Sequence, residues 1–234
     1  MVLRFFFLAF LLISCATPER DNPYDPDRVN STGGKGKGSE IANYRTVQIG
    51  DQIWMAQNLD YNVKGSRCYD NIEANCATYG RYYDWVTAMA LPTSCEYNSC
   101  ASQVGEKHRG ICPIGWHIPS EADWSILMKF LNPSCSDNSS CSLAGNMLKA
   151  TSGWNNTGYG ENGTDDYNFT ALPGGFCNIY GVFYDLGKYG NWWTSAEYDN
   201  NSGAYGRYMS YDSRAVSRGH SAKSILLNVR CIKD

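Results

Sequence analysis

Residues 44–59, YRTVQIGDQIWMAQNL, predict a β-hairpin at the start of a folded domain. Two runs rich in β-branched and aromatic residues are separated by Gly50 and Asp51, a pair that favours a tight turn. In both runs apolar residues alternate with polar ones, as they do in strands that bury one face. These alternating residues are Val47, Ile49, Ile53 and Met55.

Helices are predicted in the middle of the chain. The strongest signal lies at residues 120–131, where Ser120 can cap a helix N-terminus and Asp123 can complete a capping box. Apolar residues then repeat at helical spacing and predict a face that packs on the core; they are Trp124, Leu127, Met128 and Leu131. Shorter helices are expected at residues 84–91 and 143–150.

Strands and turns dominate from Phe169 onward. The strand-like runs are FTALPGGF (169–176), VFYDLG (182–187), NWWTSAEY (191–198), AYGRYMSYD (204–212) and ILLNVRCI (225–232). Two or three short helices in the middle and strands at both ends predict an α+β domain whose terminal strands pair in one sheet.

The composition favours a packed domain and excludes several classes of protein. The chain has 234 residues, of which 14% are aromatic and 18% are charged. This balance argues against collagen, coiled coil and disorder. The 20 basic residues are scattered among 23 acidic ones, and the formal net charge is −3, so no nucleic acid is expected as a partner.

The first residues have the pattern of an export signal. Residues 5–13 form an apolar run of about nine residues, too short for a membrane span, which needs roughly 20. The run ends in LISC at residues 12–15, which resembles the bacterial lipobox. This resemblance implies that residues 1–14 are a lipoprotein signal peptide and that Cys15 is lipidated. The alternative is a secreted protein with an incidental cysteine at the cleavage site.

Residues 15–43 are predicted to be the lipidated cysteine and a flexible tether, because this stretch contains proline first and glycine later and has little to bury. The membrane is then a partner through the lipid anchor on Cys15. Ala16 follows the cysteine, which by resemblance to the Gram-negative sorting rule implies an outer-membrane lipoprotein, facing the periplasm or the cell surface. Residues 44–234 are predicted to be a single domain.

The cysteines predict a disulfide-stapled domain in an oxidising compartment. Three pairs each bracket a short polar stretch, as surface loops closed at their base would: Cys68 with Cys76, Cys95 with Cys100, and Cys135 with Cys141. Cys112 and Cys231 remain as a long-range pair, and Cys231 shares the core-facing alternation of a final strand. Cys177 is left over and is expected to be a buried, inert thiol. No CxxC spacing supports a zinc site.

Seven motifs occur in an order that resembles a known family. They are YRTVQIGDQIWMAQNLDYNV, CYDNIEANCATYGRYYDW, ICPIGWHIPSEADWSIL, AGNMLKATSGWN, GTDDYNFTALPGGF, NWWTSAEY and NVRCIKD. Together they resemble the Fibrobacter succinogenes major paralogous domain over residues 44–234. The resemblance implies a lipoprotein-type surface or secreted module and carries no established activity.

A more distant resemblance, in WHIPS, ALPGG, WWTSAE and VRC, implies a C-type-lectin-like fold, shared with formylglycine-generating enzymes. In that fold the N- and C-terminal strands pair, and a long loop region presents the ligand contacts. Here that region would be residues 151–224.

Metal and catalytic sites have weak support in the sequence. The Glu-Pro-Asn, Gln-Pro-Asp and Trp-Asn-Asp motifs of calcium-dependent sugar sites are missing. Glu161, Asp165 and Asp166 could hold a calcium ion, the alternative being Asx-turn capping; no other cofactor is expected. His117 is expected to be a hydrogen-bonded core residue without an acidic partner fixed near it. No catalytic constellation stands out.

Aromatic residues in the strand region favour a binding function, since amphipathic rings grip sugars and proteins. The residues predicted to contact a ligand are Trp193, Tyr205, Arg207, Tyr208, Tyr211 and Asp212. Strand alternation predicts that one of Trp192 and Trp193 lies in the core and the other nearer to solvent. We therefore expect a surface-tethered, non-catalytic binding or adhesion module whose ligand is a glycan. The alternatives are a structural envelope protein that engages protein partners and a hydrolase with an unrecognised site.

Overall fold

The computed structural model describes residues 44–136, 140–156, 162–198 and 201–234. A four-stranded antiparallel sheet contains the predicted hairpin, with strand order β1-β2-β11-β4. Its strands are β1 (Thr46–Ile49), β2 (Gln52–Met55), β4 (Trp116–His117) and β11 (Ile232–Lys233). Ile232 pairs with Trp54, so the first and last parts of the domain meet in one sheet, as the sequence predicts.

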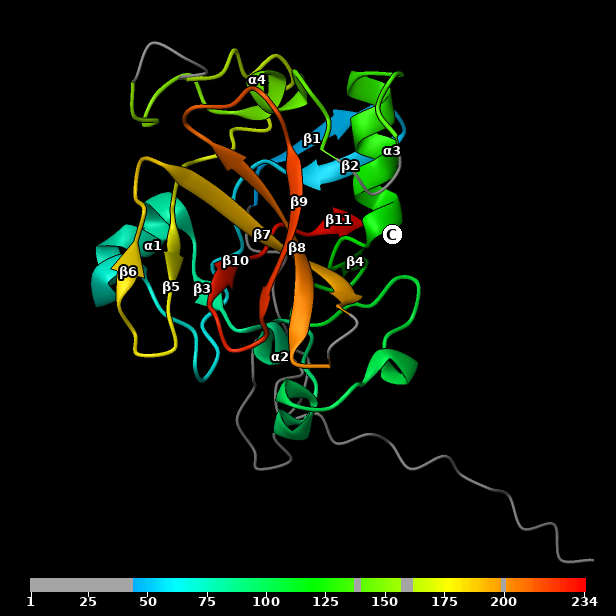
Figure 1. Ribbon diagram of the computed structural model, residues 1–234, viewed down its shortest axis with the longest axis vertical. Helices are drawn as coiled ribbons and strands as arrows, with labels where there is room; N and C mark the ends of the chain where they lie inside the picture. The colour runs from blue at the N-terminus through cyan, green and yellow to red at the C-terminus, as the bar shows by residue number, and fades with distance from the viewer. Residues whose placement is uncertain (1–43, 137–139, 157–161, 199–200) are drawn as a thin grey trace, which may run out of the picture.

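A second sheet of five strands crosses the molecule in the order β3-β10-β7-β8-β9 (Figure 1). Its strands are β3 (Tyr82–Tyr83), β7 (Tyr189–Glu197), β8 (Gly203–Ser210), β9 (Ser217–Ala222) and β10 (Leu227–Asn228). Only the β10–β7 pair is parallel among the pairs of this sheet that the described residues form. A separate hairpin joins β5 (Phe176–Cys177) to β6 (Phe183–Tyr184).

The helices are short and lie between the strands in the sequence. The longest, α3 (Glu121–Leu131), has the predicted capping box, in which Ser120 and Asp123 each accept a hydrogen bond from the other's backbone N–H. The predicted helices at 84–91 and 143–150 are present as α2 (Trp85–Ala88), capped by Asp84, and α4 (Ala144–Leu148). The short 3₁₀ turns are η1 (Tyr69–Asn71), η2 (Thr93–Glu96) and η3 (Ala101–Gln103). The chain is thus an α+β domain, as predicted.

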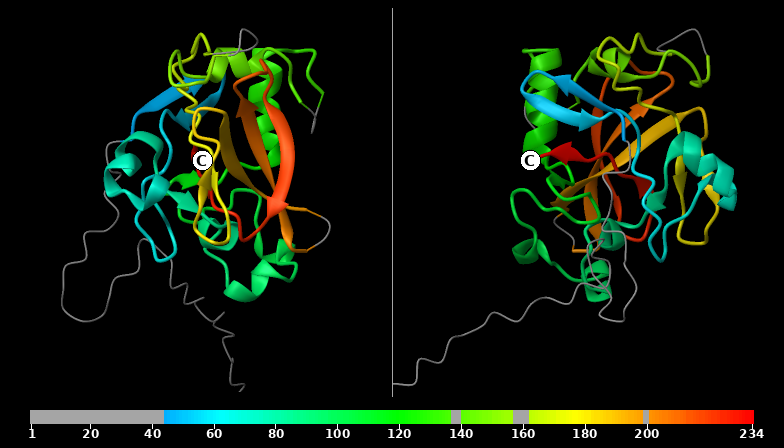
Figure 2. Two further views of the ribbon diagram at one scale, coloured as in Figure 1. Left: turned by 60° about the vertical axis from the view of Figure 1, so that its left-hand side comes forward. Right: turned by 180° about the vertical axis from the view of Figure 1, so that it is seen from behind.

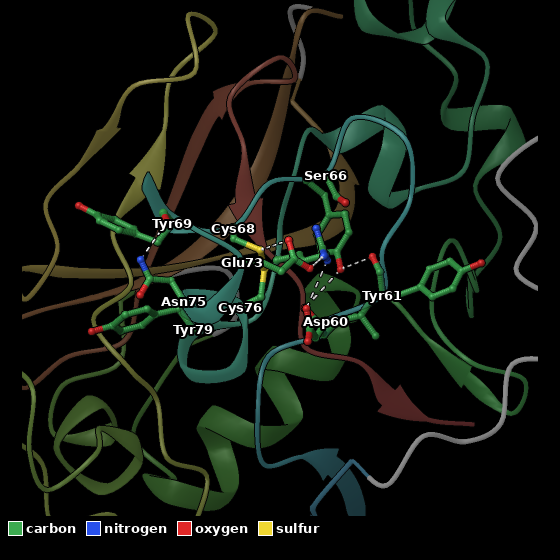
Figure 3. Close-up of a disulfide and its surroundings, with 12 residues drawn as sticks. Asp60, Tyr61, Ser66, Cys68, Tyr69, Glu73, Asn75, Cys76 and Tyr79 are labelled. Carbon is green, nitrogen blue, oxygen red and sulfur yellow. Dashed lines mark hydrogen bonds and ion pairs between the residues drawn. A yellow bond between two sulfur atoms is a disulfide. The ribbon is translucent and has the colours of Figure 1, made fainter. Parts of the chain in front are cut away.

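Helix α1 (Glu73–Tyr79) occupies a stretch that the sequence predicts as a stapled polar loop. Figure 3 shows the Cys68–Cys76 bond joining η1 to α1, with Asn75 turned toward Tyr69, whose carbonyl oxygen accepts its amide hydrogen at 3.0 Å. The sequence does not predict this helix, because the helix buries little more than Cys76 and so has no apolar stripe. The disulfide and the Asn75 hydrogen bond thus hold α1 in place, as an apolar face does in an ordinary helix.

Two cores lie on opposite faces of the five-stranded sheet. The α2 core gathers around Trp85, Ile118 and Trp193, and the α3 core gathers around Trp54, Trp124 and Trp192. Trp192 and Trp193 are therefore both buried, at 1% and 0% exposure, and the prediction that one of them lies near solvent is wrong. Alternation does place them on opposite faces, but α2 and α3 with their neighbouring segments cover both faces of β7.

The four predicted disulfides are all present, and the free Cys177 is buried. Three of them close short loops, whereas Cys112–Cys231 joins residues 119 positions apart. Cys231 belongs to the α2 core with the residues that share its predicted alternation, namely Ile225, Leu227 and Val229. The chain passes there from β10 in one sheet to β11 in the other.

Candidate ligand groove

A groove of about 540 Å³ opens on the face of the five-stranded sheet that also carries Trp193. Gly206 on β8 lies directly opposite Gly219 on β9, and residues opposite each other in a sheet share a face. Neither residue has a side chain, which leaves room on this face of β8 and β9, and the ring of Tyr208 leans over Gly219. The β5–β6 hairpin stands beside the sheet and forms one wall (Figure 2).

Aromatic rings line the groove. Tyr189 on β7 and Tyr208 on β8 have ring centroids 6.4 Å apart, with their planes inclined at 56°. On the opposite wall, Phe176 stacks on Tyr184 with a centroid distance of 5.6 Å and an interplanar angle of 27°. Phe176 also packs against the α2 core. The rings are therefore held by strands and by core contacts, which fixes the shape of the groove before any ligand arrives.

Polar groups sit between these rings. The side-chain amide of Asn191 donates to the carbonyl oxygen of Gly175 at 3.1 Å, which orients its own oxygen as an acceptor. Asp185 and Ser221 add a carboxylate and a hydroxyl to the lining. Partial burial raises the pKa of Tyr189, and the carboxylates of Asp212 and Asp185 raise it further, so its phenol stays a hydrogen-bond donor. The groove thus combines flat apolar rings with both donors and acceptors.

The opposite face of β8 and β9 carries a ladder of stacked side chains. The guanidinium of Arg218 lies 3.5 Å from the ring centroid of Tyr205, and the ring of His220 stacks on Tyr198 at 3.9 Å with an interplanar angle of 6°. Arg207, at 1% exposure, forms an ion pair with Glu121 at 2.8 Å. These contacts tie the sheet to the start of α3 and lie on the face away from the Gly206–Gly219 floor.

The residues predicted to contact a ligand divide between the two faces and the core. Tyr208 lines the groove, and Asp212 is exposed and close enough to affect Tyr189. Tyr205 belongs to the opposite face, and Tyr211 is half-buried against the α3 core. Trp193 is fully buried and donates to the carbonyl oxygen of Tyr83, so its side chain is not placed to contact a ligand, contrary to the prediction. Arg207 is among the residues that border the groove, but its guanidinium forms an ion pair with Glu121.

Sequence reasoning missed most of the groove. Phe176, Asp185, Tyr189 and Asn191 line it, and none of them is among the residues predicted to contact a ligand. The one signal that could have found it is the pair of glycines in GRY and RGH, residues 206–208 and 218–220. Glycine within a strand marks a place where a side chain is excluded, but only the strand register shows that these two glycines face each other.

His117 has two carboxylate partners, contrary to the sequence prediction. It is a hydrogen-bonded core residue as expected, with its Nδ1 atom 2.7 Å from Asp234 Oδ1 and its Nε2 atom 3.3 Å from Asp123 Oδ2. Burial lowers the pKa of His117, but the hydrogen bonds to Asp123 and Asp234 outweigh it and leave the pKa above its ordinary value. Ser120 donates to Asp123 rather than to His117, so this cluster lacks the nucleophile–base contact of covalent catalysis.

Of the three residues considered for a calcium ion, Asp165 has its carboxylate held by a neighbouring threonine. Both carboxylate oxygens of Asp165 accept hydrogen bonds from Thr170, from its backbone N–H at 2.7 Å and its hydroxyl at 2.8 Å. Asp166 is exposed, and Glu161 lies outside the described residues. In the described part of the chain no three His, Cys, Asp or Glu side chains gather as a metal site would require. Thr170 thus already uses one acceptor site on each oxygen of Asp165.

Comparison with known proteins identifies the family. The family model described as the Fibrobacter succinogenes major domain matches residues 47–233, which is most of the chain. The chain belongs to this family. No curated protein and no solved structure matches the chain. The C-type-lectin-like fold, the more distant of the two resemblances, therefore stays a prediction, while membership of the Fibrobacter succinogenes major domain family is established.

Two further observations concern the membrane. Cys15 and the predicted tether lie outside the described residues. Among the helices of the described segments, none combines the length and the apolar character needed to span a bilayer.

Proposed function

We propose that this Fibrobacter succinogenes major domain is a non-catalytic binding module that takes a glycan in the groove beside Gly206 and Gly219. The observation that carries the proposal is the pairing of a glycine floor with the rings of Tyr189 and Tyr208. Sugars present apolar C–H faces edged by hydroxyl groups, which suit rings flanked by hydrogen-bonding side chains. Asn191, Asp185 and Ser221 supply such side chains.

The module is further proposed to be an outer-membrane lipoprotein anchored through Cys15, with residues 16–43 as a spacer. The lipobox-like LISC at residues 12–15 supports the anchor. Mass spectrometry of the N-terminal peptide from the purified chain tests it directly. A diacylglyceryl group on Cys15, absent from a Cys15→Ser variant, is the expected result; an unmodified Cys15 would refute the anchor without touching the groove.

A glycan screen of the full chain, purified with its disulfides formed, tests the groove. We expect binding that survives EDTA and weakens by about tenfold or more, that is about 1.4 kcal/mol, in Tyr208→Ala. Tyr205→Ala is the matched control, because Tyr205 is a half-buried tyrosine on the other face of the same strand. Equal losses in the two variants, or no binding of any glycan by folded protein, would refute the proposal.

A further inference from the structure

The β5–β6 hairpin and the residues just after it expose large apolar side chains, and three of these, Ile179, Tyr180 and Val182, lie in the hairpin loop. Five of them are at least 40% exposed, and Tyr180 reaches 82%. They are Ile179, Tyr180, Val182, Tyr184 and Leu186. Residues 176–184, FCNIYGVFY, contain no charged residue, whereas the chain as a whole is 18% charged. Exposed apolar residues are ordinary when scattered, but a cluster on one projecting loop needs an explanation.

The hairpin holds these side chains in a fixed conformation. The side-chain oxygen of Asn178 accepts hydrogen bonds from the backbone N–H groups of Tyr180 at 2.9 Å and Val182 at 3.0 Å. The backbone N–H of Asn178 donates to the carbonyl oxygen of Val182 at 2.9 Å. Asn178 therefore closes the loop from both sides, and little conformational entropy is left to lose when the loop meets a partner.

The base of the hairpin is equally well anchored. Phe183 packs against Tyr69 and Tyr82, with centroid distances of 4.8 and 5.3 Å. Cys177 pairs with Leu226, next to the five-stranded sheet. The apolar tip thus projects from a rigid support at the side of the molecule away from α3 (Figure 1).

We propose that this tip, the hairpin loop with Ile179, Tyr180 and Val182, dips into the interfacial layer of a membrane, so that the module rests on the lipid surface to which it is tethered. Tyrosines with aliphatic neighbours are the side chains that favour the boundary between headgroups and acyl chains. Arg67 lies beside the tip, so close that a β-carbon on Gly181 would come within 3.2 Å of its Nη1 atom. A guanidinium in this position suits anionic lipid headgroups.

The size of the tip favours a lipid surface over a protein partner. A stable protein interface uses roughly 20 to 30 residues on each side, and the tip offers three large apolar side chains, Ile179, Tyr180 and Val182. A weak contact suffices for a tethered domain, since residues 16–43 would reach about 90 Å at full extension and keep the effective lipid concentration high. This step rests on the proposed anchor at Cys15.

Fluorescence quenching by lipids with brominated acyl chains tests the contact. The full chain carrying Tyr180→Trp, the tip reporter, is reconstituted in vesicles of phosphatidylethanolamine and phosphatidylglycerol. The matched control reporter is Tyr97→Trp, because Tyr97 is 72% exposed on the separate loop after η2. We expect the fluorescence that the tip reporter adds to fall at least about twofold with brominated lipid, and that of the control reporter to stay unchanged. Equal responses from the two reporters would overturn the inference.

A charge substitution and two further readouts separate the outcomes. Ile179→Asp with Val182→Asp should abolish quenching of the tip reporter, whereas Ile114→Asp, at a residue with 63% exposure elsewhere, should not. If Cys15 carries its lipid but the tip reporter is not quenched, the membrane contact of the tip is refuted and the anchor is retained. If the tip reporter is quenched although Cys15 carries no lipid, the anchor is refuted and the membrane contact is retained. A tip reporter that brominated lipid does not quench, but that is protected from an aqueous quencher only while the chain is dimeric, would mean that the tip binds a second copy instead.

Discussion

Gly206 on β8 lies opposite Gly219 on β9, and a β-carbon on Gly219 would stand 3.1 Å from the Cε1 atom of the Tyr208 ring. The groove and its aromatic wall are therefore coupled: two strands lack side chains at the same level, and Tyr208 leans into that space. A substitution that shifts the pairing of β8 with β9 at Gly206 and Gly219 would therefore also change the groove.

Gly219→Val should close the groove while leaving the domain folded. The new side chain would displace the ring of Tyr208 on an accessible face rather than enter a core. We expect glycan binding to weaken by about tenfold or more and the free energy of unfolding to change by less than about 1 kcal/mol. Calorimetric titration with denaturant unfolding would measure both. Thr46→Val, at an exposed strand position in the four-stranded sheet, is the control, and unchanged binding in Gly219→Val would place the ligand elsewhere.

Asp234→Asn should change how stability depends on pH. The pKa of His117 lies above its ordinary value because the hydrogen bonds to Asp123 and Asp234 outweigh burial. A histidine with a raised pKa in the folded state contributes stability that is full below its unfolded pKa of about 6.5 and is lost as pH rises through the folded pKa. We expect Asp234→Asn to cost about 1 kcal/mol near pH 5.5 and much less near pH 9.

Urea unfolding across this range would measure the difference between Asp234→Asn and the parent chain. Asp212→Asn is the control, because Asp212 is an exposed carboxylate that acts on Tyr189, whereas Asp123 and Asp234 act on His117. A pH-independent cost for Asp234→Asn would show that its role is not electrostatic.

Loss of the Cys112–Cys231 bond should destabilise the domain more than loss of a short-range disulfide. In the chain-entropy model a closed loop of about 120 residues contributes about 5 kcal/mol, and the Cys95–Cys100 loop contributes about 2 kcal/mol. We expect the double serine variants to rank in that order in guanidinium unfolding. Equal effects would point to residual structure in the unfolded chain.

Arg230→Lys should be strongly destabilising although the charge is kept. Arg230 is fully buried, and burial lowers its pKa to about 9, which still leaves it charged at neutral pH. Its guanidinium bonds Asn58 Oδ1 at 2.8 Å and the carbonyl oxygens of Phe169 and Thr170, a fork that an ammonium group cannot reproduce. We expect a loss of about 3 kcal/mol, measured by thermal unfolding. Arg45→Lys, at an exposed arginine, should cost little.

Local patterns in the sequence predict the local parts of this fold. The hairpin at residues 44–59, the capping box of α3 and the three short-range disulfides each depend on residues close in the chain. The long disulfide follows from the sequence only as the pair that remains, supported by the alternation that ends at Cys231. Helix α1 is not predicted by the sequence, because its stability comes from a disulfide and a side-chain hydrogen bond rather than from an apolar stripe.

The groove could not be predicted in the same way. Its lining comes from β5, β7, β8, β9 and β10, and only the register between strands brings Gly206 opposite Gly219. Alternation separates Trp192 from Trp193 but does not say that both sheet faces are covered. His117 likewise gains Asp234 through the pairing of β4 with β11, a contact between residues 117 positions apart.

Residues 227–233 supply a central strand to each of the two large sheets, β10 between β3 and β7, and β11 between β2 and β4. A nascent chain that ends near residue 220 would therefore have both sheets split in half, with the hairpin of residues 46–55 lacking its neighbour. Contacts that span so much of the chain form late, because the entropy of closing a long loop is lost before the strand pairing can offset it. The two sheets would consequently stay incomplete until nearly all of the sequence has been synthesised.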